Sequence, residues 1–244
     1  MKDEIYRKQP GDEPFRFDDS VAKVFPDMLR RSIPGYSASL EAIGSLAARY
    51  VQDGSNCYDL GCSLGAATLA MRQGILARDC RIVAIDTSEA MIDRCRDLIA
   101  ADDAANPEAT AVDVVRGDIM DQDINNASMV VLNYTLQFLA LAERDTLLCR
   151  ICDGLNPGGL LVLSEKVLDE NEHMEELLSD LHHEHKRRND YSAMEVSRKR
   201  AALENVLIPE TVTAHRKRLL DAGFERIVVW LRYFNFVSII AIKA

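Results

Sequence analysis

From Asn56 onward, short apolar runs alternate with longer stretches in which apolar residues recur at helical spacing. The apolar runs cover residues 57–60, 81–86, 112–117, 128–134 and 159–165. The amphipathic stretches predict helices over residues 66–77, 88–103 and 141–154, the second with Ser88 as its N-cap. Strands that alternate with helices in this way are typical of a parallel sheet covered by helices, so the pattern predicts an α/β fold.

The end of the chain has a different pattern. Two β-rich runs, 226–232 and 234–243, are separated by only a short connection. Such a pair predicts an antiparallel hairpin, which we place at the edge of the sheet. The expected architecture is a Rossmann-like mixed sheet of seven strands. Because we find no internal repeat, low-complexity segment or interdomain linker, we expect one domain over residues 1–244.

Two further helical segments lie outside this pattern, at residues 18–50 and 167–210. The first is expected to form an N-terminal cap and the second a helical insertion. The sequence pattern does not require either segment to cover the sheet, so both are candidates for a lid or for a contact between subunits.

Composition and charge narrow the function. The chain has 48% hydrophobic residues and a formal net charge of -10, so it can bury a substantial core and would repel a polyanion at long range. A small-molecule site is therefore favoured over direct nucleic-acid binding. An uncharged apolar run of the roughly 18 residues that span a bilayer is missing, and we expect a cytoplasmic protein without membrane contact.

The cysteines and histidines do not predict a metal site. The six cysteines are scattered through expected core elements, and the CxxC pair Cys149 and Cys152 lies in a helical pattern with no second pair of ligands nearby. We interpret the cysteines as free thiols. The histidine-rich stretch 179–191 is polar, and adjacent histidines point in different directions on a helix, so we expect a solvated helix face.

The turn after the first expected strand is the clearest candidate site. It reads Gly61-Cys62-Ser63-Leu64-Gly65, which lacks the G-x-G-x-x-G spacing of a dinucleotide site. Asp59 lies two residues before Gly61, and its carboxylate would oppose a bound phosphate while favouring a cationic ligand. The turn therefore favours a ligand with an ammonium or sulfonium group.

Acids follow the next two expected strands. Asp86 ends the second strand, where a carboxylate can accept from both hydroxyls of a ribose. Gly117-Asp118-Ile119 follows the third strand and suits the amino group and ring face of adenine. Acid–glycine turns are common in loops, but three strand-end acids in this order favour S-adenosylmethionine as the ligand.

These motifs resemble those of class I S-adenosylmethionine-dependent methyltransferases, as does the terminal hairpin. Segments outside the common core are more specific. Together they resemble the carboxy-S-adenosyl-L-methionine synthase family, and they cover residues 17–40, 126–139, 155–166, 197–207 and 234–244.

The resemblance implies an activity and partners. Members of this family convert S-adenosyl-L-methionine and prephenate into carboxy-S-adenosyl-L-methionine and phenylpyruvate, through a sulfonium ylide and without a metal. The product serves a downstream tRNA carboxymethyltransferase that makes 5-oxyacetyl uridine at the wobble position. The resemblance also implies a homodimer that does not itself bind tRNA.

The resemblance further assigns cofactor contacts, although it identifies no catalytic base. Arg200 would clamp the added carboxylate, while the residues alone place it in a basic run that is typical of a solvated helix face. Thr87 stands where the family has asparagine, so its contact would be through the backbone. The implied contacts are Tyr36, Gly61, Cys62, Ser63, Asp86, Thr87, Asp118, Ile119, Asn133 and Arg200.

Two alternative functions remain open at this point. The same site would serve a conventional methyltransferase that acts on a small molecule or a tRNA base. The second alternative is a non-enzymatic protein that binds the cofactor as a scaffold for the downstream transferase.

Overall fold

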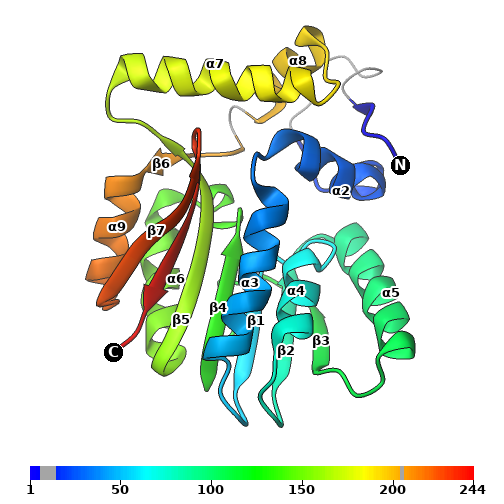
Figure 1. Ribbon diagram of the computed structural model, residues 1–244, viewed down its shortest axis with the longest axis vertical. Helices are drawn as coiled ribbons and strands as arrows, with labels where there is room; N and C mark the ends of the chain where they lie inside the picture. Colours follow the sequence, from blue (N-terminus) through cyan, green and yellow to red (C-terminus); the bar gives the residue numbers. More distant parts are fainter. Residues whose placement is uncertain (6–14, 204–205) are drawn as a thin grey trace.

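The computed structural model describes residues 1–5, 15–203 and 206–244, and of residues 199–201 it describes the backbone alone. Its main feature is a twisted sheet with the strand order β3-β2-β1-β4-β5-β8-β7 (Figure 1). Strands β1 to β5 pair in parallel, whereas β8 is antiparallel to both β5 and β7. The strands are β1 (Asn56–Leu60), β2 (Arg81–Asp86), β3 (Ala111–Arg116), β4 (Ala127–Asn133), β5 (Leu155–Leu168), β6 (Glu210–Thr211), β7 (Arg226–Tyr233) and β8 (Phe236–Ile242).

Helices cover both faces of this sheet. In Figure 1, α3, α4 and α5 lie on one face and α6 and α9 on the other. The helices are α2 (Asp19–Ser32), α3 (Tyr36–Tyr50), α4 (Ala66–Gly74), α5 (Glu89–Ala105), the short 3₁₀ helix η1 (Leu136–Phe138), α6 (Leu141–Gly154), α7 (Glu172–Arg188), α8 (Ala193–Leu203) and α9 (Val212–Asp221).

The central strands are buried on both faces, which explains their continuous apolar sequence. Every residue of β1 is buried, as is every residue of β4 except the last, Asn133. Alternate side chains of β4 enter two separate apolar clusters, one under α6 and α9 and the other under α3 and α4. Asn133 therefore marks the point where the buried strand reaches the candidate site.

The α/β class, the mixed sheet and the C-terminal hairpin predicted from the sequence are confirmed. The predicted N-cap is also correct, because the Ser88 hydroxyl accepts a hydrogen bond from the Met91 N–H. Two details differ. Strand β5 begins at Leu155 rather than at residue 159, and the short strand β6, which pairs with Val167 and Leu168 of β5, makes an eighth strand.

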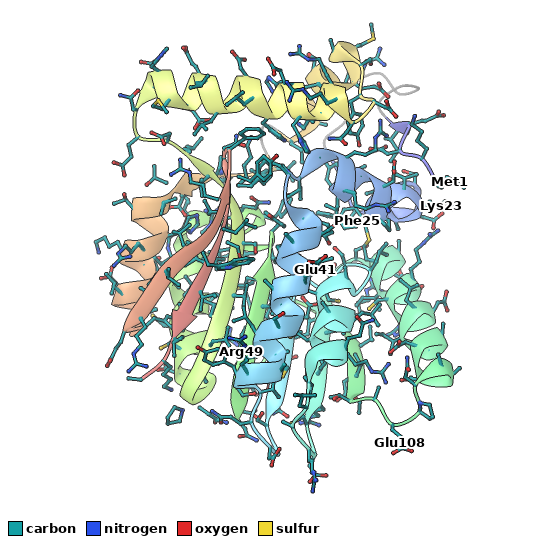
Figure 2. The ribbon with its side chains drawn as sticks, viewed as in Figure 1. Met1, Lys23, Phe25, Glu41, Arg49 and Glu108 are labelled. Atoms are coloured by element: carbon teal, nitrogen blue, oxygen red, sulfur yellow. The ribbon has the colours of Figure 1, made fainter. Side chains whose placement is uncertain are left out.

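The expectation that the N-terminal helices are not needed to cover the sheet is wrong for α3. Its buried residues Ile43 and Ala47 pack in the same cluster as β1, β4 and β5. Glu41 and Arg49 lie on the exposed side of the same helix, as Figure 2 shows. The spacing of four residues between Ile43 and Ala47 places both on one helical face, so α3 is part of the core.

The remaining helices, α2, α7 and α8, lie across the end of the sheet where the parallel strands finish (Figure 1). Glu108, in the turn between α5 and β3, is at the opposite end (Figure 2). The Arg31 Nε of α2 donates to the Asn189 carbonyl at a distance of 2.6 Å, which fixes the end of α7 to α2. The helical insertion predicted at residues 167–210 therefore lies beside the carboxyl ends of the strands.

The six cysteines are free, which confirms their interpretation as thiols. Within the described ranges, no helix is long and apolar enough to span a bilayer.

Candidate functional site

The turn after β1 is tightly joined to β2. The N–H groups of Gly61 and Cys62 both donate to the Ile85 carbonyl at 2.9 Å. Gly61 has φ +81°, and a Cβ at this position would lie 2.4 Å from the Thr135 side chain. Only glycine fits such a conformation without strain, and the turn therefore approaches the loop after β4 through backbone alone.

Asp86, at the end of β2, connects this turn to the start of α5. Its carboxylate accepts hydrogen bonds from the N–H of Ser63 and the N–H of Ser88, each at 2.9 Å. Burial raises the pKa of Asp86, and the backbone N–H groups of Ser88, Ser63 and Thr87 oppose that rise. Each oxygen keeps a second lone pair, so Asp86 can accept from a ribose diol while held in this position. The Thr87 side chain is exposed.

Asp59 is more deeply buried than its sequence position suggests. The Thr68 hydroxyl donates to its Oδ2 at 2.6 Å, while Oδ1 is buried and has no hydrogen-bond partner among the described residues. Burial raises the pKa of Asp59 to about 6; the Thr68 hydrogen bonds lower it, and the charge of Asp86 raises it further. A cationic ligand group near this end of β1 would stabilise the ionised carboxylate.

The other predicted contacts come from neighbouring elements. The Gly117 N–H donates to the Asp86 carbonyl at 3.1 Å, which brings the loop after β3 to the end of β2. Asp118 is exposed, and its carboxylate accepts from the Met120 N–H, whereas the Ile119 side chain is buried. This loop can therefore offer a carboxylate to a ligand, whereas the Ile119 side chain packs in the core.

Tyr36 and Asn133 complete the described part of the site. Tyr36 is buried at the start of α3, with its ring centroid 6.3 Å from that of Tyr134. Burial raises the pKa of the Tyr36 hydroxyl, and the charge of Asp59 adds to this rise, so the two side chains are within electrostatic reach. In the part of the chain that the structure describes, the buried Oδ1 atom of Asn133 has no hydrogen-bond partner.

These residues fit S-adenosylmethionine. The buried oxygens of Asp59 and Asn133, which lack a partner within the described ranges, suit a ligand that brings hydrogen-bond donors or positive charge, and the glycine turn allows close approach. Asp86 would hold the ribose. Arg200 lies in α8, and its side chain is outside the described part of the chain.

A buried arginine that sequence reasoning missed supports the loop after β4. Arg144 of α6 is fully buried and donates to the carbonyls of Gln137, Leu139 and Ile208 at 2.8–3.2 Å. It also forms an ion pair with Glu210 at 2.6 Å. The arginine thus joins the loop around η1 to the segment that returns from the helical insertion. An arginine inside an apolar helical pattern was the available signal.

Gln137 extends this network toward the site. Its side-chain amide donates to the Tyr134 carbonyl at 3.4 Å, and its Oε1 accepts from the Lys166 N–H at 2.9 Å. Glu165, next to Lys166, is fully buried, and this burial raises its pKa well above the usual value. Burial raises the pKa of Tyr134, and the charges of Tyr36 and Glu165 add to this rise, so Glu165 is within electrostatic reach of Tyr134.

The expectation that the histidine-rich stretch is a solvated helix face is wrong for two residues. His182 and Lys186 of α7 are buried. The His182 Nε2 lies 2.8 Å from the Ser32 carbonyl, and its ring centroid lies 4.8 Å from that of Phe236. Both partners come from distant parts of the chain, so the local pattern could not reveal them.

A groove of about 680 Å³ exists elsewhere, between α5, β3 and the segment before β4. It is lined by Arg81 at the start of β2 and by Asn125 before β4. The lining extends along β3 as far as Val115 and includes none of the predicted cofactor contacts, so the groove is separate from the site around Asp86. Ligands of open α/β sheets bind at the carboxyl ends, so this groove is not the candidate site.

The described residues contain no group of three or more His, Cys, Asp or Glu residues arranged to hold a metal ion. The expectation of a reaction without a metal stays a prediction.

Comparison with solved structures shows the class of fold. A putative O-methyltransferase from Nostoc punctiforme aligns with a TM-score of 0.63 and 15% identity, over 92% of this chain and 59% of that one. Human N-acetylserotonin methyltransferase in complex with S-adenosylmethionine aligns with a TM-score of 0.63 and 18% identity, over 92% of this chain and 55% of that one. Residues 58–159 match the family model described as a methyltransferase domain. The fold is therefore that of the methyltransferase class.

Sequence comparison is more specific. Carboxy-S-adenosyl-L-methionine synthase from Aliivibrio fischeri (strain MJ11) is 55% identical over 229 residues, which are 94% of this chain and 93% of the relative. The protein of the same name from Marinobacter nauticus is 51% identical, over 100% of this chain and 96% of the relative. This chain belongs to the carboxy-S-adenosyl-L-methionine synthase family, and it is an enzyme.

Proposed function

We propose that this enzyme converts S-adenosyl-L-methionine and prephenate into carboxy-S-adenosyl-L-methionine and phenylpyruvate. The observation that carries the proposal is the similarity to synthases of that name over nearly the whole chain, helical insertion included. The acids Asp59 and Asp86 at the strand ends support it, because they suit a ribose and a cationic sulfonium ligand.

The reaction balances without an external oxidant or reductant. Prephenate loses its ring carboxylate as carbon dioxide and its hydroxyl as hydroxide, and its ring becomes aromatic. The methyl group of S-adenosylmethionine loses a proton and gains the carbon dioxide, while the proton and hydroxide form water. Helices α7 and α8 lie over this end of the sheet, where they can exclude the water that would otherwise trap carbon dioxide.

Mass spectrometry of the purified enzyme after incubation with both substrates tests the proposal. We expect equal amounts of phenylpyruvate and of the carboxylated sulfonium nucleoside. Methyl transfer from S-adenosylmethionine to a small molecule or tRNA base, with no phenylpyruvate, would instead identify a conventional methyltransferase. Cofactor binding without any product would identify a scaffold.

Arg200 is proposed to bind the carboxylate of the product. A guanidinium forms two parallel hydrogen bonds with a carboxylate, and each charge-assisted bond contributes about 1.5–3 kcal/mol. Arg200→Ala should therefore weaken carboxy-S-adenosylmethionine about tenfold or more relative to S-adenosylmethionine. Arg188→Ala, which removes an exposed arginine paired with Glu184, is the matched control. Equal losses for the two nucleosides would exclude this role.

A homodimer is proposed as well. Met174 and Leu177 expose apolar side chains on the same face of α7, as expected where a second copy packs. Light scattering on Leu177→Glu should show a smaller assembly than the wild type, and a monomeric wild-type enzyme would refute the proposal.

We also propose that the enzyme is cytoplasmic and that its product reaches a downstream tRNA carboxymethyltransferase for wobble-uridine modification. The net charge of -10 disfavours direct contact between this enzyme and tRNA.

A further inference from the structure

Four aromatic side chains form a continuous row from the cofactor residues to α7. The ring centroids of Tyr36 and Tyr134 are 6.3 Å apart, those of Tyr134 and Phe236 are 6.0 Å apart, and those of Phe236 and His182 are 4.8 Å apart. The row begins beside Asn133, which is predicted to contact the cofactor. All four side chains are buried, so the row forms a largely apolar aromatic surface inside the protein, next to the place where the reacting methyl group would lie.

Lys166 lies at this surface. It is paired directly with Phe236 across the antiparallel β5 and β8 strands. Residues directly opposite each other in such a pair project to the same face of the sheet, so Lys166 is on the Phe236 side. The Lys166 side chain is partly exposed, and its backbone N–H is held by Gln137. A ligand can thus reach this lysine while its backbone position is fixed.

Lys186 approaches from α7. It follows His182 by four residues, so the two side chains are neighbours on one helical face, and both are buried. Burial is the main cause that lowers the pKa of His182 to about 2, and the charges of Lys186 and Lys166 lower it further. Both ammonium groups are therefore within electrostatic reach of the His182 ring. The imidazole therefore stays neutral.

The proposed co-substrate has two carboxylates with different fates. The ring carboxylate departs as carbon dioxide, whereas the side-chain carboxylate remains in the product. A cation on the departing carboxylate would stabilise the ground state more than the transition state, because the negative charge leaves that group as the bond breaks. An apolar surface has the opposite effect: it destabilises the fully charged carboxylate of the ground state more than the transition state, in which the charge has partly left this group.

We propose that Lys166 and Lys186 bind the side-chain carboxylate that the product retains, while the ring carboxylate lies against Tyr134 and Phe236. This inference rests on the proposed function and adds the binding site of the second substrate. It assigns the lysines to binding alone. The bond between the ring and its carboxylate breaks next to the aromatic surface, and its electrons complete the aromatic ring as hydroxide departs.

Lys166→Gln and Lys186→Gln test the assignment. Removal of one charge-assisted hydrogen bond should raise the KM for prephenate about 10- to 100-fold. Because the product keeps the same carboxylate, inhibition by phenylpyruvate should weaken by a similar factor. The Kd for S-adenosylmethionine, measured by calorimetry, should stay within about twofold. Lys217→Gln is the control, since Lys217 is exposed on α9 and pairs with Asp221.

The outcomes separate the possibilities. A higher KM for prephenate with unchanged phenylpyruvate inhibition would mean that the lysines bind the departing carboxylate, and it would overturn the assignment. Values equal to those of Lys217→Gln would also overturn it, while the proposed function would stand. If wild-type enzyme makes no phenylpyruvate, the proposed function fails first. Should the buried Lys186→Gln variant not fold, the partly exposed Lys166→Gln variant decides the question.

Discussion

Replacement of the buried Arg144 by methionine is the most direct test of how the helical insertion is tied to the site. Arg144 is the centre of a network that joins the loop around η1 to residues 208–210. Methionine fills a similar volume without charge or donors. The substitution should therefore remove the hydrogen bonds while it leaves much of the packing in place.

The loss can be worked out from the partners. The Gln137 carbonyl keeps a second donor, the Ile208 N–H at 2.9 Å, so it is not left unpaired. The Leu139 and Ile208 carbonyls lose the hydrogen bonds that Arg144 donates, and an unpaired buried group costs about 1–3 kcal/mol. Glu210 keeps two hydrogen bonds from Arg218, at 2.8 and 2.9 Å, so its charge remains compensated. We expect a total loss of about 3 kcal/mol, toward the lower end for a broken buried ion pair.

Urea denaturation followed by circular dichroism measures this loss. A decrease of about 3 kcal/mol in the free energy of unfolding is within the usual total of about 5–15 kcal/mol, so the variant should still fold at 25 °C. Arg144→Lys retains the charge but not the fork of donors, and it should lose about half as much. Arg96→Met is the control, because it removes an exposed arginine of α5 that pairs with Asp93 and lies outside the Arg144 network. A loss for Arg144→Met that is no larger than that for Arg96→Met would refute the reasoning.

Three further predictions concern the turn, the buried acid and the helix contact. Gly61→Ala should lower the free energy of unfolding by about 2–4 kcal/mol, because of the positive φ and the overlap with Thr135. In urea denaturation, the double variant that also carries Thr135→Ala should regain the part of this loss that is due to the overlap. Because the pKa of Asp59 is raised to about 6, the wild type should gain up to about 3 kcal/mol of stability relative to Asp59→Asn as pH falls from 7 to 4. Calorimetry should show S-adenosylmethionine affinity falling through the same range in the wild type and a flatter profile in Asp59→Asn. Gly74→Ala should lower the thermal midpoint by several degrees, since its Cβ would lie 2.0 Å from the Gly44 carbonyl oxygen of α3, and an unchanged midpoint would contradict that close approach.

The sequence was sufficient to predict the parts of the fold that depend on local patterns. Strand positions followed from apolar runs, and Ser88 was identified as a cap because its side chain acts on the helix that directly follows it. The core role of α3 had a usable signal too, since Ile43 and Ala47 recur at helical spacing. Because the predicted pattern of strands and helices begins at Asn56, these two residues were not predicted to pack on the sheet, although their spacing is visible in the sequence.

Other features had no local signal. His182 is buried because Ser32 and Phe236, which are distant in sequence, pack against it. Strand β5 begins at Leu155, where an Asn-Pro-Gly-Gly run predicts only a turn, because its first residue pairs with Ala127 before the register shifts. Long-range pairing of this kind depends on the assembled sheet, and a single sequence does not display it.

The distribution of charge suggests how a methyltransferase-like core can handle a carboxylate. The strand ends carry the acids Asp59 and Asp86, which favour a cationic nucleoside. Lys186 lies on α7 of the insertion, and Lys166 lies at the end of β5 beside it. Opposite charges that sit on separate elements can bind a cation and an anion side by side without neutralising each other. The insertion can therefore add an anion-binding site while the cofactor turn keeps its acids. Such an arrangement requires α7 to lie against the carboxyl ends of the strands, and the contact between His182 and Ser32 holds it there.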